Sequence, residues 1–376
     1  MKILHFSDVH FDTPFRELPK EIGDMRRAEL RESFNRIISK AIEEKVDLIL
    51  LAGDLFDNTT VEKSTLIFIK EQMDRAKKYN IKVFIAAGNH DPYNNRSFYS
   101  MIDWGDNVYI FNEEIEKVYL EELGVVVYGA SFKDKYIRES KLKEFKVDDK
   151  DLDLIKIMVL HGEISNASEG EYNPITIREI YESKLDYLAL GHVHKFSGIS
   201  KEGRTSYAYP GCPEGRGFDE TGDKGVILGD ISNGFVDLEF IKFNKREYFV
   251  NELDVSECET KEDILENIKL SIPKEVRMKN LFNIILKGKV KEHLKIDIDL
   301  LEKLLKDEFF YCRILNESKI DFDIDELSNE YSIKGIFCSM MKEAFEEEEE
   351  NPEILELAFN IGMESLLDGE VNLNED

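Results

Sequence analysis

Apolar residues fall into two patterns along the chain, short unbroken runs and stretches with helical spacing. The unbroken runs end at Phe6, Ala52, Ala87, Leu160 and Leu190. Short apolar runs without alternation are typical of strands covered on both faces of a sheet. Between the first three runs, about 24–45 and 61–79 show the apolar spacing of core-facing helices. Strand and helix in alternation predict βαβ units and a parallel sheet.

The next portion, about 108–240, is richer in short apolar runs. We expect these runs to form a second sheet stacked on the first, with helices outside. One helix is predicted to begin at Pro174, because proline is favoured in a first turn. The runs lie at 108–111, 125–128, 157–160, 187–190, 206–209 and 225–228. Residues 1–246 are therefore expected to form one α/β domain.

A smaller α+β domain is predicted at 247–325, after a change in composition near residue 246. Thr260 and Asp263 have the spacing of a capping box, which should open a short helix. A strand over 281–290 and a helix over 299–307 are expected to complete this domain.

The remaining residues, 326–376, are predicted to form an acidic helical tail. One helix is expected to run into the five consecutive acids at 346–350, and another to begin at Pro352. Such a run of acids is most often a solvated surface. The apolar side of the last helix could pack within the chain or bind a partner helix.

Charge is distributed unevenly along the chain, whose formal net charge is −28. A strongly acidic protein is at first sight a poor candidate for binding nucleic acid. However, residues 341–376 hold 13 acidic residues and one basic residue, whereas 274–295 hold seven basic and two acidic residues. Lys287, Lys289 and Lys291 are therefore candidates for contacts with DNA phosphates, although most basic runs are simply solvated.

The cysteines and the apolar runs together favour a cytoplasmic protein without a membrane partner. No run approaches the roughly 18 apolar residues of a membrane span, and the N-terminus lacks a signal-peptide pattern. The cysteines are far apart, without the spacing of a zinc site or disulfide framework. They are Cys212, Cys258, Cys312 and Cys338.

Side chains that bind metal ions follow the apolar runs directly. They are Asp8, His10, Asp54, Asn89, His161, His192 and His194, with His90 next to Asn89. In open α/β sheets the ligand site lies beyond the carboxyl ends of the strands. One histidine at such a place is usually structural. A structural role is also expected for His5, which lies inside the first apolar run, and for His293, which lies in the basic segment. Five of the seven histidines at strand ends instead indicate one shared metal site.

The donor set combines imidazole with carboxylate and amide oxygen and contains no thiolate. Such a set suits Mn²⁺, Fe²⁺ or Zn²⁺, and Mn²⁺ fits best for a cytoplasmic site rich in oxygen ligands. Two such ions about 3.5–4 Å apart can share a carboxylate and a hydroxide. The hydroxide would attack a phosphate in line while the ions neutralise charge on its oxygens. The sequence therefore predicts a two-metal phosphoesterase centre but does not name the substrate.

The ordered set D-x-H, GD, GNHD, H-G and GHVH resembles the five-part signature of the calcineurin-like metallophosphoesterase superfamily, and it spans residues 8–194. The resemblance implies a four-layer α/β/β/α sandwich followed by a small capping domain. It also implies roles for the matching residues. The first metal ion would be held by Asp8, His10 and His194. The second would be held by Asn89, His161 and His192, with Asp54 bridging both. His90 would contact the scissile phosphate and protonate the leaving oxygen.

Three further stretches, 5–10, 45–57 and 209–213, are similar to the SbcD-type DNA-repair nucleases. The stretches at 214–217 and 220–225 are similar to their YhaO-like branch. This resemblance implies an exonuclease or endonuclease that acts on DNA ends with Mn²⁺. It also implies an SbcC-type coiled-coil ATPase as partner, for which the tail at 326–376 is the docking candidate.

Two other functions stay open at this point. A small-molecule phosphodiesterase or phosphatase would explain the acidic charge without a DNA-binding surface. A non-catalytic scaffold subunit of an ATPase complex would not need the complete set of metal ligands. The sequence also leaves open the polarity of cleavage and whether the chain forms a homodimer.

Overall fold

The structure of the protein, a computed structural model, describes residues 1–57, 61–167, 170–347 and 352–368. The chain forms two compact units, Met1–Tyr248 and Phe249–Asp376. Their division lies close to the boundary expected at residue 246. The helical tail, which the sequence suggested as a separate segment, belongs to the second unit. Of the five consecutive acids, 348–350 lie outside the described residues.

The first sheet of the first unit has the strand order β12-β11-β1-β2-β3-β4. Its strands are β1 (Lys2–Phe6), β2 (Leu48–Leu51), β3 (Lys82–Ile85), β4 (Val108–Ile110), β11 (Gly225–Ser232) and β12 (Phe235–Lys242). Strands β1 to β4 are parallel, as the alternation of strands and helices predicted. Strand β11 pairs antiparallel with both β1 and β12.

The second sheet has the order β5-β6-β7-β8-β10-β9. Its strands are β5 (Glu116–Leu120), β6 (Val125–Ala130), β7 (Ile155–His161), β8 (Tyr187–Gly191), β9 (Ser200–Glu202) and β10 (Thr205–Ala208). The placement of the runs at 108–111 and 225–228 in this sheet was wrong, since β4 and β11 belong to the first sheet. An apolar run indicates a strand covered on both faces, but it does not identify the neighbouring strand.

Helices α1 (Lys20–Glu43) and α2 (Lys63–Lys78) connect the first strands, and α3 (Ile177–Ser183) precedes β8. Helix α1 begins earlier than expected, directly after Pro19. Its first turn lacks the apolar spacing that marks the rest. The helix expected at Pro174 begins at Ile177 instead. A capping box formed by Thr176 and Glu179 sets this start, because each side chain accepts a hydrogen bond from the other residue's backbone.

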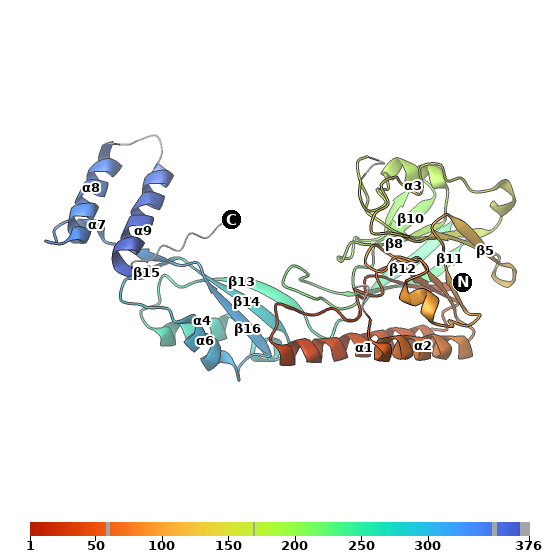
Figure 1. Ribbon diagram of the computed structural model, residues 1–376, viewed down its shortest axis with the longest axis horizontal. Helices are drawn as coiled ribbons and strands as arrows, with labels where there is room; N and C mark the ends of the chain where they lie inside the picture. The colour runs from red at the N-terminus through yellow and green to blue at the C-terminus, as the bar shows by residue number, and fades with distance from the viewer. Residues whose placement is uncertain (58–60, 168–169, 348–351, 369–376) are drawn as a thin grey trace. The chain divides into compact units, whose positions relative to one another are not determined.

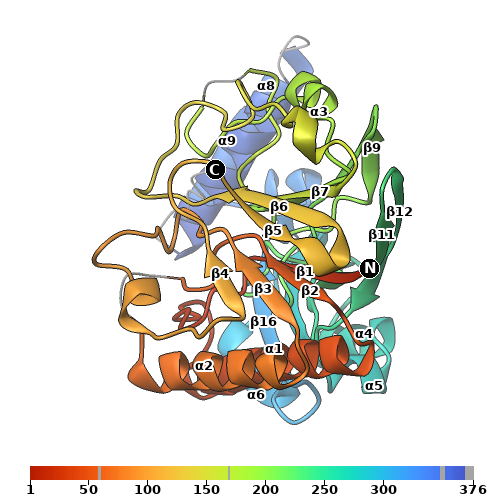
Figure 2. The same cartoon turned by 90° about the vertical axis from the view of Figure 1, so that its right-hand side faces the viewer.

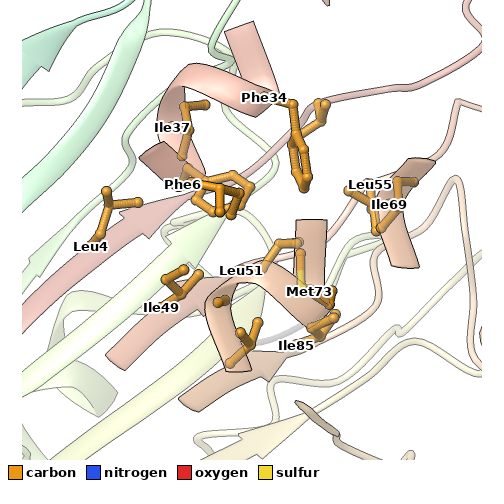
Figure 3. Packing of buried hydrophobic residues seen from close by; sticks show 14 of the residues in the cluster. Leu4, Phe6, Phe34, Ile37, Ile49, Leu51, Leu55, Ile69, Met73 and Ile85 are labelled. Carbon is orange, nitrogen blue, oxygen red and sulfur yellow. The ribbon is translucent and has the colours of Figure 1, made fainter. Parts of the chain in front are cut away.

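Alternate residues of the first sheet face two different layers. Leu4, Phe6, Ile49, Leu51 and Ile85 pack against Phe34 and Ile37 of α1 and Ile69 and Met73 of α2 (Figure 3). The opposite face packs on the second sheet through Ile3, Leu48, Leu50 and Phe84, which meet Val125, Val127, Ile157 and Val159. The far face of the second sheet packs with Ile180 of α3. The first unit is therefore the expected four-layer α/β/β/α sandwich (Figures 1 and 2).

The second unit contains a three-stranded sheet of β13 (Tyr248–Asp254), β14 (Leu281–Lys287) and β16 (Tyr311–Asn316). Helices α4 (Lys261–Ser271) and α6 (Ile298–Leu305) share its core, and α5 (Lys274–Arg277) is short. The capping box predicted at Thr260 is confirmed by its bonds with Asp263. The strand expected over 281–290 is interrupted at Gly288, which has a φ of +100°. Beyond it, β15 (Lys289–Lys291) pairs with β17 (Lys319–Asp321).

Three helices end the described chain: α7 (Ile324–Leu327), α8 (Ile333–Glu347) and α9 (Pro352–Asp368). Their small core consists of Leu327, Cys338, Phe359 and Met363. The side chains of Ile333, Ile336 and Met340 on α8 are exposed, and their spacing places them on one helix face. Among the described residues, no helix is both long enough and apolar enough to cross a membrane.

Candidate metal centre

The seven residues predicted as metal ligands come from the carboxyl ends of strands in both sheets. Asp8 and His10 follow β1, Asp54 follows β2, Asn89 follows β3, His161 ends β7, and His192 and His194 follow β8. The two sheets face each other, so the segments after these strands meet at one edge of the sandwich. The structure thus brings together all seven residues.

A first group of donor atoms consists of Asp8, His10 and His194. The Nε2 atoms of His10 and His194 lie 3.2 Å apart. The Oδ1 atom of Asp8 lies 3.6 Å from His194 Nε2 and 4.0 Å from His10 Nε2. Two imidazole nitrogens and a carboxylate oxygen therefore converge on one point, as they would around a divalent cation.

A second group consists of Asn89, His161 and His192. The Oδ1 atom of Asn89 lies 2.9 Å from His161 Nε2 and 3.3 Å from His192 Nδ1. Asp54 lies between the two groups, with its Oδ2 atom 3.4 Å from His161 Nε2 and 3.6 Å from His10 Nε2. This is the place of a carboxylate that could bridge two ions.

The chemistry of these atoms fits a pair of divalent cations. Asp54 Oδ2 is buried and has no hydrogen-bond partner among the described residues, and such a buried oxygen is costly unless a cation compensates it. Burial raises the pKa of Asp54. Burial also lowers the pKa of His192 to about 4 and that of His10 well below its usual range. These two imidazoles are therefore neutral, which is the form that binds metal.

The backbone around the site adopts conformations that few side chains tolerate. Asp8, His10, Asp54 and His192 have positive φ angles of 55°, 51°, 50° and 111°. Non-glycine residues in this region are uncommon and cluster at functional sites. Gly191 is required for a different reason, because a Cβ there would lie 1.7 Å from the Ala52 carbonyl oxygen. Only glycine allows the two sheets to approach this closely.

His90 lies at the rim of the site, and 43% of its side chain is exposed. Its backbone N–H donates to Asp54 Oδ1 at 3.0 Å, and its Nδ1 lies 3.0 Å from the Asp57 carbonyl oxygen. With Nδ1–H donating to this carbonyl, Nε2 is the nitrogen left to meet a substrate. His90, His10 and Asp57 also offer three ligand atoms within metal-binding distance of one another.

The sequence interpretation missed the residues that hold the ligands in place. Asp91 accepts hydrogen bonds from the backbone N–H groups of Leu55, Phe56 and Gly88 and from the Tyr99 hydroxyl. It therefore ties the loop after β2 to the loop after β3. Its position as the last residue of the GNHD motif was the only indication in the sequence.

Glu220 and Arg216 are a second set of residues that the sequence interpretation missed. The Glu220 Oε1 atom lies 2.7 Å from His194 Nδ1, and Arg216 donates to the same carboxylate. Burial alone would raise the pKa of Glu220, but the hydrogen bond from His194 and the Arg216 charge hold the pKa well below its usual range. Arg216 and Glu220 lie 22 and 26 residues beyond His194. The similarity of 214–217 and 220–225 to the YhaO-like branch was the only signal in the sequence, and it did not indicate a role at the metal site.

The three lysines suggested as DNA contacts lie in the second unit and are engaged in ion pairs. Lys287 pairs with Glu317, Lys291 with Glu259 at 2.7 Å, and Lys289 with Glu356 at 3.6 Å. Each pair offsets part of the positive charge that the sequence concentrates in 274–295. His5, expected to be structural, is buried and lies 2.8 Å from the Tyr187 hydroxyl.

The sandwich and the two groups of donor residues define a metallophosphoesterase, and comparison with known proteins agrees. The family described as calcineurin-like phosphoesterase matches residues 1–196. The chain is 30% identical over 354 residues to the uncharacterized metallophosphoesterase YhaO of Bacillus subtilis (strain 168), covering 89% of this chain and 84% of that protein. The chain belongs to the calcineurin-like phosphoesterase family, whose members use a dinuclear divalent metal site to hydrolyse phosphoesters.

More distant relatives carry a functional name. The chain is 28% identical over 300 residues to the DNA double-strand break repair protein Mre11 of Sulfurisphaera tokodaii, covering 77% of this chain and 74% of that protein. It is 26% identical over 354 residues to the protein of the same name from Sulfolobus acidocaldarius, covering 90% and 88%. Among solved structures, TT1561 of Thermus thermophilus matches with a TM-score of 0.37 and 12% identity, covering 60% of this chain and 92% of that chain.

Proposed function

We propose that the protein is a two-metal phosphodiesterase that cleaves DNA at its ends during repair. The observation that carries the hydrolytic part is the convergence of two donor groups on either side of Asp54. The DNA part is supported by the relatives named as double-strand break repair proteins. The stretches shared with SbcD-type nucleases favour the same assignment.

Each side chain of the site has a distinct part in the proposed reaction. Two divalent ions, for which Mn²⁺ suits the donor set best, would acidify a water for in-line attack and neutralise phosphoryl charge. Asp8, His10 and His194 would hold one ion, and Asn89, His161 and His192 would hold the other. His90 donates a proton from Nε2 to the leaving oxygen, while the Asp57 carbonyl fixes its ring. Asp91 keeps the two loops in register.

Digestion of end-labelled duplex DNA with added Mn²⁺ tests this proposal. We expect shortened labelled products with the chain alone or after addition of a candidate coiled-coil ATPase. Labels at each end and a closed circular substrate distinguish exonuclease from endonuclease cleavage and give the polarity. Intact DNA under all these conditions would contradict the proposal.

A small-molecule phosphodiesterase is a second candidate, and the ion pairs of Lys287, Lys289 and Lys291 favour it because they offset the basic charge. Cyclic nucleotides and a bis-aryl phosphodiester are the comparison substrates. Cleavage of DNA should weaken steeply with salt, since binding releases counterions from the polymer. Efficient hydrolysis of the small esters without cleavage of DNA would favour the second candidate.

The helical end of the chain is the proposed docking segment for a coiled-coil ATPase. Helix α8 presents Ile333, Ile336 and Met340 to solvent, with exposed fractions of 74%, 64% and 66%. An apolar stripe with this spacing is suited to lie against another helix. The complete set of metal ligands argues against a scaffold without activity of its own. A purified chain that binds no metal and stays inert with Mn²⁺ would favour the scaffold.

A further inference from the structure

Glu220 and Arg216 lie directly behind one of the two metal-binding groups. His194 turns Nε2 towards Asp8 and His10 and Nδ1 towards Glu220 Oε1, which is 2.7 Å away. If Nε2 binds the ion, Nδ1 carries the proton and donates it to the carboxylate. Arg216 Nη2, 2.9 Å from the same Nδ1, is then a neighbour rather than a donor to it.

Both oxygens of the Glu220 carboxylate accept hydrogen bonds. Arg216 donates to Oε1 through Nε at 3.1 Å and Nη2 at 2.8 Å, and its backbone N–H donates to Oε2 at 2.8 Å. The Cys212 thiol lies 3.5 Å from Oε2. Only 7% of the Glu220 side chain is exposed. A carboxylate fixed in this way can orient the imidazole it binds.

Arg216 also reaches the other histidine of the same group. Its Nη1 donates to Asp57 Oδ1 at 3.2 Å, and this oxygen lies 3.2 Å from His10 Nδ1. The contact with His10 has the distance of an ion pair without the alignment of a hydrogen bond. Arg216 thus joins two carboxylates, one beside each histidine of the first group.

The second metal-binding group has a different environment. His161 donates its Nδ1–H to the Ala52 carbonyl oxygen at 2.9 Å, which is a neutral acceptor. A carboxylate behind a ligating histidine fixes its tautomer and makes it a stronger ligand than a carbonyl does. The two halves of the site should therefore differ in affinity for the same ion.

We infer that Asp57, Arg216 and Glu220 form a positioning clamp that makes the half-site of Asp8, His10 and His194 the tighter of the two. The clamp acts through the histidines and touches neither substrate nor reacting atoms. This inference deepens the proposed function and rests on its two-metal site. It assigns roles to residues outside the five motifs.

Manganese binding tests the clamp without any need for activity. Titration of the metal-free chain with Mn²⁺, followed by calorimetry and electron paramagnetic resonance, gives the two affinities and the spin-coupled signal of a manganese pair. We expect Glu220→Ala to weaken the tighter ion about 10- to 100-fold and to replace the coupled signal by that of isolated Mn²⁺. Glu220→Gln, whose amide oxygen can still accept from Nδ1, should restore part of the affinity.

Glu214→Gln is the matched control, because Glu214 is also a buried carboxylate and lies in the same loop. It accepts from Arg26, Ser33 and the Lys245 backbone rather than from the metal site. We expect a lower melting temperature with both manganese affinities unchanged. If Glu214→Gln and Glu220→Gln lost manganese affinity equally, Glu220 would act only by stabilising the loop, and the inference would be overturned.

Manganese binding by the wild-type chain distinguishes a failure of the clamp from a failure of the proposed function. Binding of two Mn²⁺ ions by the wild type and, unchanged, by Glu220→Ala would refute the clamp while leaving the proposed function standing. A wild-type chain that binds no manganese would refute the proposed function and the clamp with it.

Discussion

His90 is the residue whose proposed role differs most from that of its neighbours. It would act on the substrate, whereas the adjacent Asn89 would hold an ion. We therefore predict that His90→Ala keeps two metal ions per chain and lowers the rate of phosphodiester cleavage about 10²- to 10⁴-fold, the usual contribution of a general acid. Metal analysis and rate measurement on one preparation check this prediction.

The control for His90→Ala is His293→Ala, which replaces an exposed histidine of the second unit and should change neither quantity. A different result for His90→Ala would be informative. Loss of a metal ion would show that His90 acts as a ligand with His10 and Asp57, whose donor atoms lie within reach.

His5 gives a prediction about stability and pH. Burial lowers its pKa to about 3, so the folded chain keeps it neutral while the unfolded chain protonates it below about pH 6.5. Unfolding therefore takes up a proton, and stability falls as the pH drops below 6.5. We compare the fall in the free energy of unfolding between pH 7 and pH 5. In His5→Asn this fall should be about 2 kcal/mol smaller than in the wild type, because the proton uptake contributes about 1.4 kcal/mol per pH unit once the pH is below 6.5. Parallel pH curves from denaturant unfolding would contradict this.

At the scale of elements, the ends of β2 and β8 define how closely the two sheets approach. A Cβ at Gly191 would meet the Ala52 carbonyl oxygen at 1.7 Å and Ser7 Cβ at 2.8 Å. Gly191→Ala should therefore push the strands apart, destabilise the fold by about 3 kcal/mol or more and weaken metal binding. Chemical denaturation and Mn²⁺ titration measure the two effects.

Gly23 of α1 provides the matched control for this substitution. A Cβ there would lie 3.5 Å from Phe15 Cβ, an ordinary contact. Gly23→Ala should stabilise the chain by up to about 1 kcal/mol, because alanine favours the helix more than glycine. If Gly191→Ala were equally harmless, the close approach of the sheets would not be needed for the site.

The sequence predicted which segments of the first unit form strands and helices better than it predicted which strands pair with one another. The strands that carry Asp8, Asp54 and His161 were recognisable because unbroken apolar runs end directly at polar residues. The same runs do not say which sheet a strand joins, so β4 and β11 were assigned to the wrong sheet. Pairing depends on hydrogen bonds between distant segments, which a local pattern cannot reveal.

The contrast between local patterns and contacts of distant segments also applies to the site. Residues that follow a strand directly could be predicted from position and chemistry, and the structure gathers all seven of them. Glu220 and Arg216 could not, because their role depends on a loop folding back against His194. The lysines of the basic segment were chosen by local charge, and their acidic partners Glu259, Glu317 and Glu356 lie elsewhere in the sequence.

At the scale of the whole molecule, hydrolysis and partner binding should be separable. Ile336→Glu places a charge in the exposed stripe of α8 and should weaken binding of a coiled-coil ATPase at least about tenfold, equivalent to about 1.4 kcal/mol. Hydrolysis of a bis-aryl phosphodiester should be unchanged. Ile67→Glu on α2 is the control, since Ile67 is 61% exposed and Ile336 is 64% exposed. Equal binding by both variants would exclude this stripe as the docking surface.

The central claim is that side chains from distant strand ends hold two divalent ions on either side of Asp54. Anomalous X-ray diffraction from crystals grown with Mn²⁺ tests this most directly. The account predicts two peaks, one among Asp8, His10 and His194 and the other among Asn89, His161 and His192. The absence of any peak at these residues, or peaks only elsewhere on the chain, would contradict it.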